Sequence, residues 1–390
     1  MNRVLVLGGG FGGIAAARGL RSRLPPDNEI VLIDKNPTFM VGFRKTWALL
    51  GMGSLEDGQR QLADLEKFGI QFIQETVSGI EPDLRAVKLG NRWIEADALV
   101  VALGSQLAHE RIPGFKEHAL NIYDPEAIPA SADALDSFQG GRILIGVFGT
   151  PYKCPPAPYE LALLTNEYFQ HKGVEAEISV FTPLPMSLPI LGDEGCVAIE
   201  GRLEKNGIGF LPGHQAIRVE AGEVIFPNRS LHYDLLLGIA PHGCPDVVVT
   251  SGLAKNSAWV QVNPRTLATT FPAVYAVGDV AQVMMANGKP LPKAGVFAEG
   301  QAEIVAQRIG ATLEGKEPRA LYEGIGGCYL EVGNGKAVMV KGEFLASSGP
   351  QVRLTKAKKS LLKKKKKFES KRLKNWFDEE IMFVEEAGAK

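Results

Sequence analysis

The first 34 residues constrain the fold more strongly than any other part of the chain. A short apolar run at 3–7 predicts a buried strand, and five of the next six residues are glycine. An alanine-rich helix is expected at 14–24, and a second strand at 29–33 ends at Asp34. A strand, a glycine turn, a helix, a second strand and an acid in this order predict a dinucleotide-binding α/β unit.

The glycine run explains how such a unit would hold its ligand. Gly8 would make the turn, Gly10 would let the backbone approach a pyrophosphate, and Gly13 would let the helix pack closely on the strand. The helix N-terminus would face the phosphates, because its first amide groups have no partners within the helix. Asp34 would bond the hydroxyls of an adenosine ribose.

Two later segments indicate which dinucleotide is meant. A buried strand from 98 ends in the small residues at 104–105, and another from 275 ends in Gly278 and Asp279. These segments resemble the two further motifs of flavoproteins with two dinucleotide-binding domains. The resemblance implies FAD, with Asp279 on its ribityl chain or phosphate.

The stretch 291–296 precedes a helix expected at 297–309. In the flavoproteins that the chain resembles, the corresponding helix directs its N-terminus at the flavin pyrimidine. The positive end of a helix dipole stabilises an anionic reduced flavin. The same resemblance gives the predicted FAD-binding residues, which are Gly8, Gly10, Phe11, Gly12, Gly13, Asp34, Lys35, Val77, Ala102, Gly104, Gly278, Asp279, Lys293, Ala294 and Gly295.

A further turn and strand, at 139–148, should open a second dinucleotide-binding unit, but the glycine fingerprint of such a unit is missing. The following residues, 150–160, read TPYKCPPAPYE. Four prolines in this stretch supply no amide donors, which a pyrophosphate requires. The next strand, at 176–181, ends at Thr182 and not at the acid that would bond a ribose of NAD. Both departures disfavour a bound nicotinamide cofactor.

The rewritten turn offers a thiol instead. Cys154 comes just before a helix expected at 161–171, and a helix N-terminus is predicted to lower the pKa of the thiol and favour the thiolate. Glu160, in the first turn, could relay protons near a flavin. The alternative is that Glu160 merely caps the helix.

A second cysteine, Cys328, follows a glycine pair that we interpret as a turn entering a β-strand. With it, the chain from Gly8 to Trp376 resembles the sulfide:quinone oxidoreductases and the flavoprotein subunit of flavocytochrome c sulfide dehydrogenase. Three stretches are the most distinctive: CPPAPYE from Cys154, GGCY around Cys328, and KAGVFAEGQA at 293–302. The resemblance implies that Cys154 and Cys328 form a redox disulfide or sulfur bridge over one flavin face.

The chain departs from these families at two places. Many sulfide:quinone oxidoreductases carry a third cysteine before the second domain, and none occurs at 121–124. The flavocytochrome subunit attaches its flavin through a cysteine after the second strand, and none occurs at 38–43. FAD is therefore predicted to be noncovalent. Cys196 and Cys244 are predicted to be small, partly buried residues.

The C-terminal segment is strongly basic. Residues 351–374 hold twelve Lys or Arg and the single acid Glu369, although the whole chain has a formal net charge of -1. An amphipathic helix over 356–384 could lie on anionic lipid, as would suit delivery of electrons to a quinone. It could equally pack on the protein body or on a partner subunit. Nucleic acid is not expected, because no recognition module accompanies the charge. The apolar positions are Leu373, Trp376, Phe377, Ile381 and Val384.

The sequence thus predicts an α/β protein with two Rossmann-like domains. The FAD-binding domain would be discontinuous, at 1–110 and 265–318, with a degenerate second domain at 111–264 and a C-terminal region at 319–390 carrying the basic tail. A cytoplasmic or peripheral membrane location is expected, because the chain has neither a signal peptide nor about 18 consecutive apolar residues. The spacing of the cysteines and histidines predicts no metal site.

The expected activity is oxidation of sulfide or a related sulfur compound through Cys154, Cys328 and Glu160, with FAD passing electrons to a quinone. Hydrosulfide would attack the disulfide and leave a persulfide on one cysteine. Three alternatives stay open: a type II NADH dehydrogenase, a sulfide dehydrogenase that reduces cytochrome c, and a sulfur carrier or redox sensor without turnover. The oligomeric state, including a homo-oligomer, also stays open.

Overall fold

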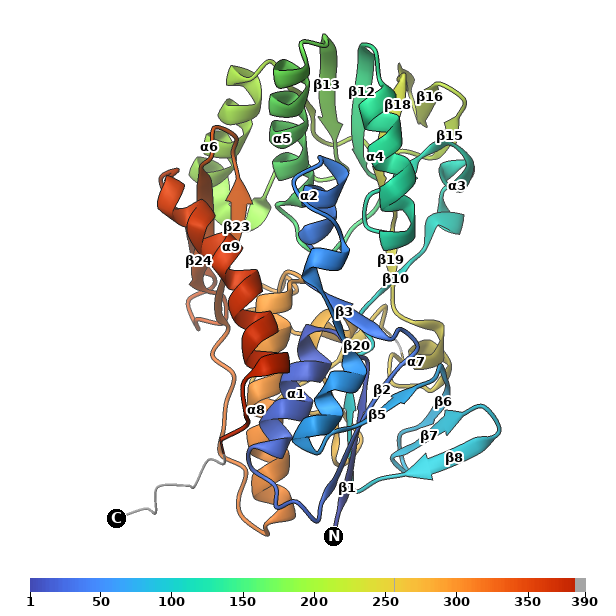
Figure 1. Ribbon diagram of the computed structural model, residues 1–390, viewed down its shortest axis with the longest axis vertical. Coiled ribbons are helices and arrows are strands. Elements are labelled where there is room, and N and C mark those ends of the chain that lie inside the picture. The colour runs from blue at the N-terminus through green and yellow to red at the C-terminus, as the bar shows by residue number, and fades with distance from the viewer. Residues whose placement is uncertain (256, 383–390) are drawn as a thin grey trace.

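Two parallel sheets organise the molecule, one at each end of its long axis (Figure 1). The computed structural model describes residues 1–255 and 257–382. The first sheet has the strand order β21-β9-β1-β2-β5, and every neighbouring pair in it is parallel. Its strands are β1 (Arg3–Leu7), β2 (Glu29–Asp34), β5 (Gln71–Gln74), β9 (Ala98–Val101) and β21 (Val274–Ala276).

The central strand β1 is apolar along its whole buried length, as expected of a parallel strand covered on both faces. Helices α1 (Phe11–Arg21) and α8 (Gly295–Leu313) pack along each other beside this sheet. Both begin earlier than predicted, because the glycines at their N-termini already have helical geometry. Since β21 comes from residue 274 onward, the sheet joins two parts of the chain that are distant in sequence.

The second sheet, β11-β18-β12-β13-β14, is also parallel. Helix α5 (Ala157–Lys172) lies on β12 and β13, and it ends at Gly173, whose φ of 68° suits a helix C-cap. The strands are β11 (Leu120–Asn121), β12 (Gly141–Val147), β13 (Ala176–Phe181), β14 (Gly209–Leu211) and β18 (Leu235–Ile239). The predicted fold class, α/β with two Rossmann-like sheets, is confirmed.

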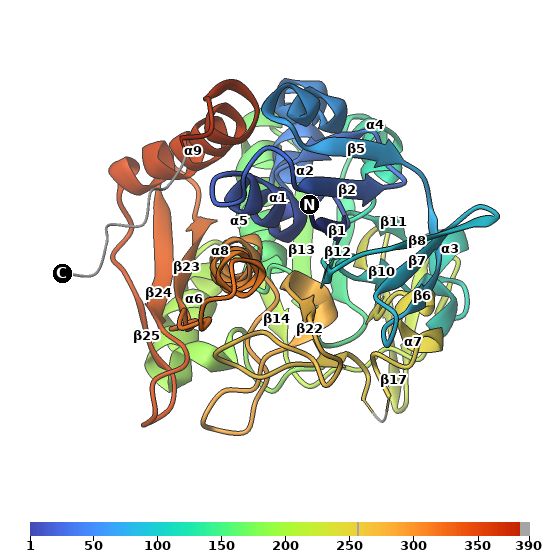
Figure 2. The same ribbon diagram turned by 90° about the horizontal axis from the view of Figure 1, so that it is seen from below.

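The C-terminal region adds a third layer (Figure 2). An antiparallel sheet of β23 (Ile325–Glu331), β24 (Ala337–Glu343) and β25 (Gln351–Leu354) leads into helix α9 (Lys359–Leu373). Strand β23 contacts both α5 and α8, and α9 contacts β23 and β24. The C-terminal layer therefore spans the boundary between the two parallel sheets.

The remaining elements form arms and connections. Two antiparallel three-stranded arms extend from the body, β6-β7-β8 and β15-β16-β17, and neither was predicted. Their bounds and those of the other elements are β3 (Thr38–Met40), β4 (Gln59–Gln61), β6 (Val77–Glu81), β7 (Ala86–Leu89), β8 (Arg92–Glu95), β10 (Gln106–Leu107), β15 (Arg218–Glu220), β16 (Glu223–Phe226), β17 (Arg229–His232), β19 (His242–Gly243), β20 (Val260–Gln261), β22 (Ala281–Gln282), α2 (Arg44–Leu49), α3 (Phe115–His118), α4 (Ile128–Ser137), α6 (Gly192–Lys205) and α7 (Asp246–Thr250).

One local prediction is wrong. The glycine pair before Cys328 is not a turn, because Gly326 and Gly327 lie inside β23. A Cβ at Gly327 would come within 2.4 Å of the Val340 carbonyl oxygen on the neighbouring strand. These glycines are needed for close packing and not for a change of chain direction.

Among the described residues, no helix has both the length and the apolar character that a membrane span requires.

Candidate functional site

The N-terminus of α1 has the geometry of a phosphate-binding turn. Gly8 has a φ of 104°, and a Cβ there would lie 2.3 Å from the Ala102 carbonyl oxygen. A Cβ at Gly13 would lie 1.7 Å from the Gly8 carbonyl oxygen, so only glycine fits. A Cβ added at Gly10, in contrast, would have no atom of the described residues within 4 Å, and none of their side chains caps the helix. The first amides of α1 therefore face open space that suits a pyrophosphate.

Asp34 closes the same turn from the end of β2. Its Oδ2 accepts a hydrogen bond of 2.6 Å from the Gly9 amide, and its Oδ1 accepts one from the Asn36 amide. The neighbouring Lys35 is exposed, whereas Val77 is buried at the start of β6.

The second glycine-acid motif lies beside the N-terminus of α8. Gly278 donates its amide to Oε1 of Gln301 at 2.7 Å, which fixes the turn after β21. Burial raises the pKa of Asp279, and the charges of Lys153 and Lys293 oppose this shift. Gly104 has a φ of 67° with open space around it. The carboxyl ends of β1, β9 and β21 thus gather the predicted cofactor residues at one sheet edge, where ligands of open α/β sheets bind.

The segment 293–295 links this edge to the thiol loop. Ala294 is the N-cap of α8, and a Cβ at Gly295 would meet the ring of Phe11 at 2.8 Å. The Lys293 ammonium donates to the carbonyl oxygen of Asp279 and lies 3.6 Å from the centre of the Trp259 ring. Burial lowers the pKa of Lys293 to about 8. Its side chain is therefore turned toward the protein backbone.

Cys154 lies in the loop between β12 and α5, three residues before the first residue of the helix. Its backbone has a φ of 53°, its amide donates to the Lys293 carbonyl at 2.8 Å, and its carbonyl accepts from Ala157 at 2.9 Å. Tyr123 donates its hydroxyl to the Lys153 carbonyl at 2.8 Å. These bonds hold the thiol loop of the second sheet against the segment that opens α8.

The prediction that the pKa of the Cys154 thiol is lowered is wrong. Burial raises the pKa of this thiol to about 11, and the charge of Glu160 raises it further. Lys365 and Lys45 oppose the shift, and they do not overcome it. The prolines at the start of α5 have no amide hydrogen with which to stabilise a thiolate.

Cys328 reaches the same site from β23. Both cysteines are free thiols and are only partly exposed. Burial raises the pKa of Cys328 well above its usual range, and the charges of Cys154 and Glu160 raise it further. The structure therefore brings the two predicted cysteines and Glu160 within electrostatic reach of one another. Cys196 is buried in α6 at 2% exposure, and Cys244 is buried at 6% exposure within electrostatic reach of Lys293.

Glu160 lies in the first turn of α5, as predicted, but it does not cap that helix. It is buried, and its Oε1 is 2.5 Å from the ammonium of Lys365. Its Oε2 accepts a 2.7 Å hydrogen bond from the Glu331 amide. Lys365 also contacts Glu331 Oε1 at 2.8 Å, and the Trp47 indole donates to that oxygen at 2.6 Å. Sequence reasoning missed this cluster of Glu160, Glu331 and Lys365.

Only some of the charged side chains in the basic segment lie at the protein surface. The side chains of Lys363, Lys364, Lys366 and Lys367 are exposed, whereas Lys365 and Glu369 are buried. Glu369 pairs with Arg44 from α2. Only part of this buried face had a signal in the sequence, because Glu369 and Leu373 interrupt the basic run four residues apart, whereas Lys365 is one of five consecutive lysines.

The apolar positions of the segment are also in contact with the body. Leu373, Trp376 and Phe377 are buried in the core that contains α1 and α8, which is the packing alternative left open above. Ile381 is partly buried against the same core. Val384 lies outside the described residues.

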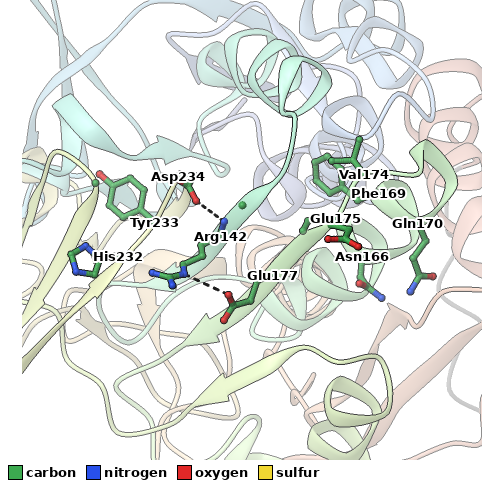
Figure 3. A pocket seen from close by; sticks show the side chains of 13 residues that line it. Arg142, Asn166, Phe169, Gln170, Val174, Glu175, Glu177, His232, Tyr233 and Asp234 are labelled. Atoms are coloured by element: carbon green, nitrogen blue, oxygen red, sulfur yellow. Dashed lines mark hydrogen bonds and ion pairs between the residues drawn. The ribbon is translucent and has the colours of Figure 1, made fainter.

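A surface pocket of about 1050 Å³ lies away from these groups (Figure 3). It is lined by the first residues of β12 and β13 and by the end of α5, including Arg142, Phe169 and Glu177. This is the amino end of the second sheet, opposite to the end where Cys154 lies. Ligands of parallel α/β sheets bind at the carboxyl end, so the pocket carries no argument for function.

Comparisons with known proteins agree with the two-sheet architecture. Residues 2–139 match the pyridine nucleotide-disulphide oxidoreductase family. Over 361 residues the chain is 25% identical to the mitochondrial sulfide:quinone oxidoreductase of Mus musculus, covering 88% of this chain and 78% of the relative. It is 33% identical to the type II NADH:quinone oxidoreductase of Staphylococcus aureus, covering 80% of this chain and 83% of that protein.

A solved structure extends the match to the C-terminal layer. The crystal structure of the sulfide:quinone oxidoreductase of Aquifex aeolicus superposes with a TM-score of 0.88 at 24% identity, covering 98% of this chain and 92% of that one. The chain is a flavin-dependent oxidoreductase and belongs to the sulfide:quinone oxidoreductase family of two-dinucleotide-binding-domain flavoproteins.

Proposed function

We propose that this enzyme binds FAD, oxidises hydrosulfide through Cys154 and Cys328, and passes the electrons to a quinone. One observation carries the proposal: Glu160, at the start of α5 beside Cys154, bonds the Glu331 amide of β23, the strand that holds Cys328, and its charge raises the pKa of both thiols. The names of the Mus musculus and Aquifex aeolicus relatives support the substrate pair.

The residues at the sheet edge fit FAD. The open first turn of α1 at Gly10 would take the pyrophosphate, and Asp34 would take the adenosine ribose. Asp279 would face the ribityl chain, and α8 would direct its N-terminus at the ring system. When bound, FAD supplies two-electron chemistry between the sulfur groups and a quinone. We further propose 1–110 and 265–318 as the FAD-binding domain, since β21 completes its sheet.

The sulfur chemistry begins from the oxidised cysteine pair. Hydrosulfide attacks one sulfur of the Cys154–Cys328 disulfide, a new S–S bond forms, and the old one breaks. One cysteine then carries a persulfide and the other leaves as a thiolate, with no net change in electron count. Removal of two electrons from these groups re-forms the disulfide and releases sulfur at the oxidation level of zero.

Glu160 would manage the protons of this exchange. Burial raises the pKa of its carboxyl, and it acts on the charge state of both thiols. Because both thiols have raised pKa values, the released sulfur takes up a proton, and a carboxylic acid within reach can supply it. The same carboxylate can accept the proton when the disulfide re-forms.

A type II NADH dehydrogenase is the second candidate, favoured by the Staphylococcus aureus relative. The start of α5 argues against it. Pro156 is the N-cap of that helix and Pro158 lies within its first turn, where a pyrophosphate of NADH would need amide donors.

Anaerobic titration distinguishes the two candidates. Sulfide should bleach the flavin absorbance of the purified protein at a ratio of about one equivalent per flavin, because each sulfide delivers two electrons. NADH should leave the absorbance unchanged over the same time. Rapid bleaching by NADH and none by sulfide would establish the second candidate instead.

The flavin should also be free of a covalent link. No cysteine that could attach the flavin occurs at residues 38–43 or 121–124. Acid precipitation should therefore leave the yellow chromophore in the supernatant, measured by its absorbance. A yellow protein pellet would contradict this prediction.

The same proposal includes peripheral contact of the segment 356–384 with a membrane, made by charged side chains alone. The apolar residues Leu373, Trp376 and Phe377 are buried, so the exposed lysines of α9 would act on anionic headgroups from the aqueous side.

A further inference from the structure

Helix α9 inserts one charged side chain into the interior next to the thiol site. Lys365 is 1% exposed, although the lysines on either side of it face solvent. Its ammonium lies 2.5 Å from Glu160 Oε1 on α5 and 2.8 Å from Glu331 Oε1 on β23. It also lies 4.8 Å from the centre of the Phe43 ring. Three separate elements therefore meet at this one cation.

The three groups form a cluster with one acid in excess. Two carboxyls and one ammonium would carry a net charge of -1 if all were ionised, and burying a net charge is costly. Burial raises the pKa of Glu160, and the two carboxyls together raise the pKa of Lys365 despite its burial. Both directions follow from the same contacts, in which two buried carboxyls share one ammonium.

We propose that Lys365 is a positioning residue of the two-cysteine site, which α9 supplies to hold Glu160 against β23 and to place a positive charge beside Cys154 and Cys328. The inference rests on the proposed role of these residues in sulfur chemistry. It assigns the C-terminal helix a part in the site that is separate from any contact with a membrane.

The electrostatic effect of Lys365 on the thiols has a definite sign. Its charge lowers the pKa of Cys154 and that of Cys328 against the larger effect of burial. The other charged groups that act on Cys154 are Glu160 from α5, Lys45 from α2 and Asp279 after β21. Removal of the Lys365 charge should therefore raise the pKa of both thiols and reduce their thiolate fractions at a fixed pH.

Thiol alkylation measures this effect without sulfide or quinone. The flavin-loaded protein is reduced with a phosphine, desalted, and treated with iodoacetamide at pH 9, and each cysteine is followed by mass spectrometry. In Lys365→Met, alkylation of Cys154 and Cys328 should be about tenfold slower, the change expected from a rise of one pKa unit. Lys365→Arg, which keeps the charge, should react at close to the wild-type rate.

The direction of the change separates an electrostatic role from a structural one. A loosened site would expose the thiols and lower their pKa, so alkylation would become faster. Lys366→Met removes an exposed lysine from the same helix and should leave the rate unchanged. An unchanged or faster rate in Lys365→Met would overturn the proposal.

A double variant covers the case in which Lys365→Met does not fold. Lys365→Met with Glu331→Gln removes one charge of each sign, so no unpaired charge is added to the interior. Its thiols should show the same slower alkylation, and a wild-type rate would count against Lys365. The alkylation assay contains no sulfide, so it tests the role of Lys365 independently of the sulfide titration. A negative sulfide titration would contradict the proposed function and would not change the alkylation rates.

Discussion

Cys154→Ser and Cys328→Ser should each reduce the rate of flavin bleaching by sulfide by at least about a thousandfold, the loss expected when a nucleophilic pair is broken. Neither variant can form the disulfide on which the proposed scheme depends. Both thiols are held by backbone contacts that serine keeps, including the bond from the Cys154 amide to Lys293. The variants should therefore bind flavin normally. Anaerobic stopped-flow absorbance with sulfide gives the rates.

Cys196→Ser is the matched control, since it makes the same change at a buried position of α6. Its bleaching rate should equal that of the wild type. If either redox variant reacts at the wild-type rate, the disulfide scheme is wrong, and sulfide must reduce the flavin by another route. Reduction by dithionite in all three variants verifies that the flavin itself is intact.

The first sheet could be predicted because its signals are local. The apolar run at 3–7, the glycines and Asp34 occur within 34 residues, and each has one structural meaning. The structure has β1 at Arg3–Leu7, as expected, and α1 begins at Phe11 within the glycine run. The strand at 274–276 belongs to the same sheet, and its Gly-Asp ending was enough to identify it.

The electrostatics of the site could not be predicted in the same way. A helix N-terminus favours a thiolate, but the burial of Cys154 has the larger effect on its pKa and the opposite sign. Helix α5, which follows this thiol, is contacted by β23 and by Lys365 of α9, and both lie more than 160 positions beyond the start of α5 in the chain. The pairing of Lys365 with Glu160 depends on the same contacts, so a run of five lysines alone looked like a solvated surface.

The C-terminal segment illustrates how composition can mislead. Basic residues with spaced aromatic residues are typical of a helix at a membrane surface. Here the Trp376 ring lies 5.3 Å from Phe11 and 5.5 Å from Phe39, centre to centre, and Phe377 stacks on Phe39 at 6.2 Å. The aromatic face thus belongs to the core beside α1, and its burial is a testable part of the fold.

Phe377→Ala should destabilise the protein by about 3–5 kcal/mol, the cost of truncating a fully buried aromatic side chain. Phe377 is 0% exposed and lies in the core that joins α1, α8 and the C-terminal segment. Thermal unfolding followed by circular dichroism should show a midpoint lower by several degrees in detergent-free buffer. Release of flavin should accompany this unfolding, because the same core supports the first turn of α1.

Met382→Ala is the matched control, because this apolar side chain lies five residues further on and is 84% exposed. Its unfolding midpoint should equal that of the wild type. If Phe377 instead inserted into lipid, its loss would leave the midpoint in buffer unchanged and would weaken only binding to anionic vesicles. A lower midpoint with unchanged vesicle binding would therefore assign Phe377 to the core, and would leave the exposed lysines of α9 as the part of the segment available to a membrane.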